Sequence, residues 1–189
     1  MNERTKLKNE DELQQFLADG FESNGWNAIR EVKPDRSNYR VDLLLLHPEY
    51  GRIGVETKYI RPGDGGRVFA EACQQIVGQY WNQKYLGEKV TMWAVAPYFE
   101  VEHRPGELDE WASGHTRGRQ QFVREFFCRL GIGFIGLSGS YAIIDFAYSV
   151  PEYKIPGFSM GRPVPERHYE NVNPDAIRKS VQAKREEFV

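Results

Sequence analysis

The chain has 189 residues, of which 40% are hydrophobic and 28% charged. A chain of this length suits one domain that can bury a core of its own. Its 25 Lys and Arg residues nearly balance 27 Asp and Glu residues, giving a net charge of −2. This balance excludes a protein held on nucleic acid or on an anionic membrane by bulk charge alone, but it allows a local basic groove.

Cysteine usage and the N-terminal sequence indicate the compartment. Cys73 and Cys128 are too few for a secreted disulfide framework, so we expect both thiols to be reduced. Residues 1–12 are charged where a signal peptide would be apolar, and no apolar run approaches the length of a membrane span. We therefore expect a soluble, cytoplasmic protein with no membrane partner.

The first half of the chain predicts a helix, three strands, a second helix and a fourth strand. Asn9 is a suitable N-cap, and Glu12 completes a capping box at the start of a helix that ends at Asn24 and Gly25. Short apolar runs bounded by turn residues then predict strands. We expect the strands at residues 26–32, 40–46, 52–59 and 90–98, and the second helix from Phe69 to about Leu86, after the Gly-rich loop 61–66.

The second half of the chain carries fewer signals. The predicted elements are a long loop over 100–118, a helix marked by Phe122, Phe126 and Leu130, a hairpin of residues 132–137 and 141–148, an arm with four prolines from Pro151 to Pro165, and a terminal helix from Asp175 to about Phe188. Together the elements predict an α/β fold with a mixed central sheet flanked by helices. We expect one domain over residues 1–150, followed by an extended arm and terminal helix over residues 151–189 that serve dimerisation or substrate contact.

Three charged residues interrupt two adjacent predicted strands. Asp42 is the single carboxylate in an apolar strand, and Glu56 and Lys58 lie two residues apart in the next strand, so they point to the same face. Burying a charge is costly unless it is paired or binds a cation. The alternative is that Glu56 and Lys58 form a cross-strand or solvated pair at a sheet edge. We favour a site.

The residue types suggest metal-assisted phosphoryl chemistry. Asp42 and Glu56 supply the hard oxygen ligands that Mg²⁺ or Mn²⁺ takes, with water and substrate oxygens completing the shell. A metal bound there would polarise a phosphodiester and lower the pKa of a bound water. Lys58 could orient or help to deprotonate the attacking water, or it could stabilise charge on the phosphate.

These residues also carry a resemblance to a known family. Asp42, followed after thirteen residues by Glu56-Thr57-Lys58, resembles the D…(D/E)xK signature of the PD-(D/E)XK nuclease superfamily, although Val41 stands where the family name has Pro. The order of predicted elements from about Glu10 to Tyr98 resembles the helix, three strands, helix and strand of the family core. The resemblance implies a restriction-endonuclease-like fold and an Mg²⁺- or Mn²⁺-dependent DNA endonuclease that leaves 5′-phosphate ends. It further implies metal ligation at Asp42, Glu56 and Thr57, a catalytic Lys58, and a homodimer.

Two supporting positions follow from the same resemblance. An inward Glu on the first helix often joins the site, and Glu12 is the candidate, ahead of Glu22; the alternative for Glu12 is the helix cap. Many members place a Gln on the helix after the xK strand. Gln75 is preferred to Gln79 for holding Lys58 or a phosphate, and the alternative is an ordinary polar helix face.

Other functions remain open from the sequence. A nuclease-like fold without catalysis could serve as a nucleic-acid-binding or assembly module, and a catalytic member could act on RNA. Basic residues gather in two places where they could follow a phosphate backbone or form a solvated face. The first group is His115, Arg117, Arg119, Arg124 and Arg129, and the second is Lys33, Arg36 and Arg40. Trp81, Trp93 and Trp111 could stack on bases, although core packing is the usual role of tryptophan.

Overall fold

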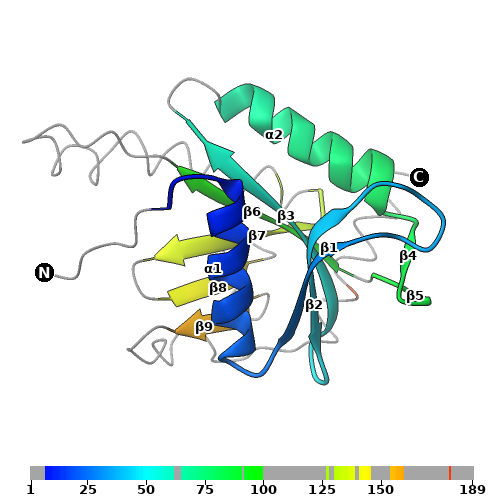
Figure 1. Cartoon of the computed structure of the whole chain (residues 1–189), viewed down its shortest axis with the longest axis horizontal. Coiled ribbons are helices and arrows are strands. Elements are labelled where there is room, and N and C mark those ends of the chain that lie inside the picture. Colours follow the sequence, from blue (N-terminus) through cyan, green and yellow to red (C-terminus); the bar gives the residue numbers. More distant parts are fainter. Residues whose placement is uncertain are drawn as a thin grey trace, which may run out of the picture.

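The computed structural model has at its centre a mixed sheet of seven strands, in the order β1-β2-β3-β6-β7-β8-β9 (Figure 1). The structure describes residues 7–61, 65–90, 92–99, 127, 130–138, 141–145, 154–159 and 179. The strands of this sheet are β1 Asn27–Val32, β2 Val41–His47, β3 Gly51–Ile60, β6 Met92–Phe99, β7 Ile132–Ser138, β8 Tyr141–Asp145 and β9 Lys154–Ser159. The helical segments are α1 Glu10–Glu22, α2 Gly65–Cys73 and the π-helix η1 Gln74–Tyr80.

Strand pairing confirms the predicted mixed sheet. β1, β2 and β3 form an antiparallel meander, and β6 pairs with β3 in parallel after the crossover through α2 and η1. β7 is parallel to β6, and β7 and β8 form the predicted antiparallel hairpin. The predicted strands of the first half agree with β1, β2, β3 and β6 to within two residues at each end.

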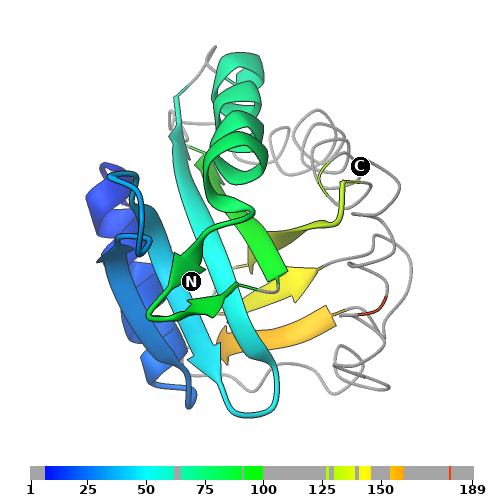
Figure 2. The same cartoon turned by 90° about the vertical axis from the view of Figure 1, so that its right-hand side faces the viewer.

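The helices cover opposite faces of the sheet (Figures 1 and 2). Leu13, Leu17 and Phe21 of α1 pack with alternate strand residues such as Leu43 and Val55 in one buried cluster. The other face forms a second cluster around α2 and η1, whose members include Ala72, Ile76, Tyr80, Leu44 and Trp93. Because strand side chains alternate between faces, β2 and β6 each contribute residues to both clusters, and this explains their near-continuous apolar runs.

The second predicted helix is shorter than expected. It ends as a π-helix at Tyr80, and the residues expected to continue it to about Leu86 form a two-stranded hairpin of β4 Lys84–Tyr85 and β5 Glu88–Lys89. Leu86 and Gly87 both have positive φ, 53° and 80°, as the turn of a tight hairpin requires. Local helix propensity is outweighed here by burial of Tyr85, which is fully buried against Trp93.

Part of the predicted C-terminal arm belongs to the sheet. Lys154–Ser159 form β9, which pairs antiparallel with β8, so these six residues of the predicted arm are a strand of the sheet. The predicted loop 100–118, the terminal helix after Asp175 and the basic group around His115 lie outside the described residues, apart from Lys179, which is helical and exposed.

Several smaller predictions are also tested by the structure. Cys73 is a free, half-buried thiol whose pKa is raised by burial to about 11, whereas Cys128 lies outside the described residues. Trp93 is fully buried in the core, so it packs rather than stacks on bases. In the part of the chain that the structure describes, no helix is long and apolar enough to cross a membrane.

Candidate active site

The backbone around Asp42 is irregular on both sides. The ladder between β2 and β3 ends at the pair Leu43–Val55, one position before Asp42 would face Glu56. On the other side, Glu31 of β1 would be its partner, but the ladder omits that pair and Glu31 has a φ of 53°. Residues other than glycine seldom adopt a positive φ. Asp42 is therefore free of regular strand pairing, and its side chain can turn toward β3.

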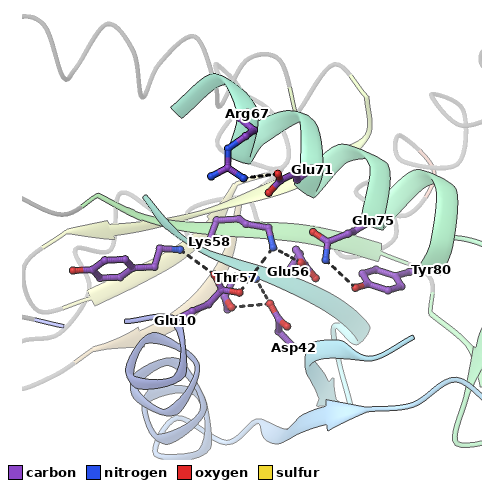
Figure 3. A network of polar contacts seen from close by, with 10 residues as sticks. Glu10, Asp42, Glu56, Thr57, Lys58, Arg67, Glu71, Gln75 and Tyr80 are labelled. Carbon is purple, nitrogen blue, oxygen red and sulfur yellow. Dashed lines mark hydrogen bonds and ion pairs between the residues drawn. The ribbon is translucent and has the colours of Figure 1, made fainter. Parts of the chain in front are cut away.

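Asp42 is held by Thr57. One carboxylate oxygen, Oδ2, accepts hydrogen bonds of 2.7 Å from both the backbone N–H and the hydroxyl of Thr57 (Figure 3). Thr57 is fully buried. The side chain of Asp42 thus accepts the hydrogen bond of the Thr57 N–H, which lies beyond the end of the β2–β3 ladder. The other carboxylate oxygen, Oδ1, could then contact a ligand. The proposed role of Thr57 as a metal ligand is not tested by these contacts.

Glu56 and Lys58 form a buried ion pair. Their Oε1 and Nζ atoms are 2.5 Å apart, and the two residues are only 1% and 8% exposed. This burial rules out the alternative of a solvated pair at a sheet edge. The second oxygen of Glu56, Oε2, is buried and has no hydrogen-bond partner among the described residues. A buried carboxylate oxygen left without a partner is costly and calls for a ligand.

Burial and mutual repulsion control the ionisation of the two carboxylates. Burial raises the pKa of Glu56 to about 8, with a further contribution from the negative charge of Asp42 and an opposing one from Lys58. Burial also raises the pKa of Asp42, although its hydrogen bonds from Thr57 oppose the shift. Such shifts are typical of sites where a cation or a proton is held between acidic groups.

The ammonium of Lys58 stays protonated. Burial alone would lower its pKa, but the carboxylates of Glu56, Glu10 and Asp42 together raise it above the usual value. Lys58 therefore acts as a fixed positive charge at neutral pH. Among the roles expected for this residue, stabilising negative charge is favoured over removing a proton.

Helix α1 contributes Glu10 to the cluster rather than Glu12. The Oε1 atom of Glu10 lies 3.9 Å from Lys58 Nζ, and its Oε2 accepts from the backbone N–H of Tyr59 at 3.4 Å. Glu12 forms the capping box: its N–H donates to Asn9 Oδ1, and its carboxylate accepts from the N–H of Lys8, both at 2.8 Å. The expectation of Glu12 in the site is thus corrected, because the cap already uses both of its groups.

Gln75 faces the cluster, and its side-chain amide contacts Tyr80. In the π-helix the N–H of Trp81 bonds to the carbonyl of Ile76, five residues earlier, at 3.0 Å. This wider turn brings residues five apart nearer to one face, and Gln75 Nε2 lies 3.5 Å from the hydroxyl of Tyr80. Figure 3 shows both side chains projecting from the helix toward Glu56. π-helical segments often occur at functional sites.

Tyr80 connects the cluster to the core. Its ring stacks on Trp93 with centroids 5.5 Å apart, and its hydroxyl is close enough to Glu56 and Asp42 for their charges to raise its pKa, after burial. Trp93 in turn lies over Gly54, where a Cβ would be 2.3 Å from the indole. Glycine at position 54 therefore makes room for the ring that supports Tyr80.

The helix-spacing rules did not indicate Glu10 or Tyr80. Glu10 could have been found from the capping box itself, because a Glu engaged in capping leaves another carboxylate of the first turn to face the sheet. Tyr80 carried no such signal, since an α-helix places residues five apart on different faces.

Asp42 and Glu56 are the residues that could hold a divalent ion of the kind the resemblance implies. Mg²⁺ typically binds through one or two carboxylates plus waters. The two carboxylates here would be that of Glu56, whose Oε2 has no hydrogen-bond partner among the described residues, and that of Asp42. No group of three His, Cys, Asp or Glu side chains gathers as a complete cage in the part of the chain that the structure describes. Water and substrate oxygens would complete the shell.

Comparison with known proteins leaves the function open. No protein-family model matches the sequence, and no curated protein matches it either. Among solved structures, a protein of unknown function from Silicibacter pomeroyi is similar over 94% of this chain and 90% of its own, with 15% sequence identity and a TM-score of 0.41. The function of the site is therefore inferred from its own geometry.

Proposed function

We propose that this protein is a metal-dependent deoxyribonuclease that hydrolyses phosphodiester bonds and leaves 5′-phosphate ends. One observation carries the proposal: Glu56 is almost fully buried beside Asp42, and one of its oxygens has no hydrogen-bond partner among the described residues. A cation bound between Asp42 and Glu56 would stabilise the ionised forms of both carboxyl groups, which burial and their mutual repulsion disfavour.

In this proposal each side chain of the cluster has its own role. Asp42 and Glu56 would hold Mg²⁺ or Mn²⁺, with Thr57 fixing the orientation of Asp42 through its two hydrogen bonds. Such an ion, when bound, neutralises charge on the phosphate and lowers the pKa of a bound water. Lys58 keeps its proton and offers a positive charge to a phosphoryl oxygen in the transition state. Glu10 holds the Lys58 ammonium from the side of α1.

The arrangement of elements supports the restriction-endonuclease-like core within this proposal. α1, the meander β1-β2-β3, the crossover through α2 and η1, and the parallel strand β6 follow one another in the order of that core. Asp42 and the Glu56–Lys58 pair lie on neighbouring strands of this unit. The homodimer belongs to the same proposal, because cutting both strands of a duplex takes two such sites.

Nicking of supercoiled plasmid DNA tests the activity. The wild-type chain should convert supercoiled plasmid to nicked and linear forms in Mg²⁺ but not in EDTA. Lys58→Met removes the charge and keeps the length of the side chain, so its rate should fall by about 100-fold or more. Lys179→Met is the matched control, since Lys179 is exposed and should leave the rate unchanged.

The alternatives give different results in the same assay. Equal nicking by wild type and Lys58→Met would contradict catalysis at this site. Binding of DNA by the wild type without any cleavage would favour an inactive nucleic-acid-binding module. A parallel reaction on labelled RNA separates the remaining alternative, because cleavage of RNA alone would contradict a deoxyribonuclease.

A further inference from the structure

A polar cavity lies beside the proposed active site, between the β1–β2 connection and the β4–β5 hairpin. Its volume is about 610 Å³, and its lining is Asp35, Arg36, Asn82, Gln83, Lys84, Gly87 and Lys89. Three of these residues are cationic and one is anionic, and none has an apolar side chain beyond glycine. A cavity of this composition suits a hydrated, negatively charged ligand rather than an apolar one.

The two lysines that line the cavity lie opposite each other on paired strands. Lys84 of β4 and Lys89 of β5 are direct cross-strand partners. Like charges directly opposite on an antiparallel pair are destabilising, and each of these strands has only two residues to offset the repulsion. An anion placed between the two ammonium groups would remove this repulsion. The pair is therefore an observation that points to a ligand, independently of the shape of the cavity.

The hairpin is held firmly in place. The N–H of Asp35 donates to the carbonyl of Lys84 at 2.8 Å, and the N–H of Gly87 donates to Asp35 Oδ2 at 3.1 Å. From the other side, Arg52 of β3 donates to the carbonyl of Tyr85 at 2.8 Å and pairs with Glu88 at 3.0 Å. The one carboxylate of the cavity is thus occupied by the backbone, and the lysines are presented on a fixed frame.

The cavity is close to the proposed active site along both of its walls. Arg36 precedes Asp42 by six residues, which limits the distance between their Cα atoms to about 20 Å. Asn82 follows Tyr80 by two residues at the end of the π-helix. Figure 1 shows the hairpin at that end of the helix, next to the β1–β2 connection. At a rise of about 3.4 Å per base pair, one short duplex segment of about six base pairs spans this distance.

We propose that this cavity binds the phosphodiester backbone of the DNA substrate, a few nucleotides from the bond that is cut. The inference rests on the proposed nuclease function and adds a backbone contact that is separate from the catalytic cluster. Lys84 and Lys89 neutralise a phosphate between them, and Arg36 contacts a neighbouring phosphate from the opposite wall. Contacts of this kind position a duplex without reading its sequence.

Binding to a fluorescein-labelled duplex, measured by anisotropy at several salt concentrations, tests the proposal. The full chain carrying Lys58→Met serves as the parent, so that binding is measured without cleavage. Adding Lys84→Gln and Lys89→Gln should weaken binding by about 10-fold or more at low salt. The slope of log Kd against log salt should also fall by about one to two, because each phosphate that the protein neutralises contributes about 0.9 to that slope. Lys179→Gln, an exposed lysine on another element, is the control and should change neither value.

The double variant should fold, because removing both charges also removes the cross-strand repulsion; its thermal unfolding midpoint should equal or exceed that of the parent. Unchanged affinity and salt slope in a folded double variant would overturn the proposal while leaving the nicking result intact. Binding by the parent to an RNA duplex but not to a DNA duplex of the same sequence would also overturn it. Absence of any duplex binding would do the same, and the nicking assay on the wild type would then decide the proposed function separately.

Discussion

The amide nitrogen of Gln75 lies 3.5 Å from the hydroxyl of Tyr80, five residues further along the chain. Residues 74–80 form a π-helix, whose wider turn brings side chains five residues apart nearer to one face than an α-helix does. Through this contact the polar face of the helix is connected to the Tyr80–Trp93 stack in the core. The geometry of the site therefore depends on packing below it.

Removing the Tyr80 hydroxyl tests this connection. Tyr80→Phe keeps the ring that stacks on Trp93 but removes the group that Gln75 contacts. A hydrogen bond within a protein contributes about 1 kcal/mol, and this one is partly buried, so the free energy of unfolding in urea should fall by up to about that amount. Tyr39→Phe, at an exposed tyrosine, is the control and should match wild type. Equal stability of the two variants would show that the Tyr80 hydroxyl makes no net contribution.

The two glutamates of the first turn of α1 should separate function from stability. Glu10 contacts Lys58, whereas Glu12 completes the helix cap. Under the proposed function, Glu10→Gln should lower the plasmid-nicking rate about tenfold or more while leaving unfolding nearly unchanged. Glu12→Gln should keep the nicking rate and reduce stability by less than about 1 kcal/mol. The reverse pattern, with Glu12→Gln as the slower enzyme, would contradict the assignment of Glu10 to the site.

Gly54 should resist substitution even by alanine. A Cβ at this position would lie 2.3 Å from the Trp93 ring, so Gly54→Ala must displace either β3 or the indole. Overpacking of this kind costs about 1–3 kcal/mol, and the displacement would also disturb Glu56 two residues away. Gly78→Ala is the control, because nothing lies within 4 Å of its Cβ and helical glycine is itself unfavourable. Thermal unfolding should show a lower midpoint for the first variant only; equal midpoints would argue against close packing at Gly54.

Stability should depend on pH through Glu56. Its pKa is raised from 4.5 to about 8 in the folded chain, so between these values the folded state binds more protons than the unfolded state. The contribution of Glu56 to stability is therefore fully present below about pH 4.5 and is lost as the pH rises through about 8. One proton accounts for at most about 1.4 kcal/mol per pH unit.

Urea unfolding across this pH range measures the effect. Glu56→Gln cannot ionise, so its stability should fall less steeply with pH than that of the wild type, and the remaining slope should reflect Asp42, whose pKa is also raised. Saturating Mg²⁺ should flatten the wild-type profile, because ion binding favours the charged carboxylate. Parallel profiles for wild type and Glu56→Gln would contradict a raised pKa at Glu56.

Local patterns in the sequence were sufficient for the central elements. Apolar runs located β2 and β6, and the capping residue Asn9 located the start of α1. The spacing of Glu56 and Lys58 placed both on one face of β3, and their burial as an ion pair agrees with that placement. These features depend on residues near one another in the chain, so period and capping rules suffice to predict them.

Other features required contacts between distant segments. The helix after β3 ends early because Tyr85 is buried against Trp93, and part of the predicted arm becomes β9 because an edge of β8 accepts it. Glu10 was not expected in the site because its role depends on how α1 crosses β3.

The sequence by itself thus determined the α/β class, the early strand order and the pairing of carboxylates with a lysine on adjacent strands. Only the tertiary structure decided that Glu10 rather than Glu12 meets Lys58, that Gln75 meets Tyr80, and that Lys84 and Lys89 lie side by side on a hairpin that lines a cavity. The physical reason is the same in each case. Periodicity fixes the face of a helix or strand on which a side chain lies. Which residues that side chain contacts depends on how α1 crosses the sheet, on the π-helix and on the register of the β4–β5 hairpin, and packing against residues distant in the chain selects all three.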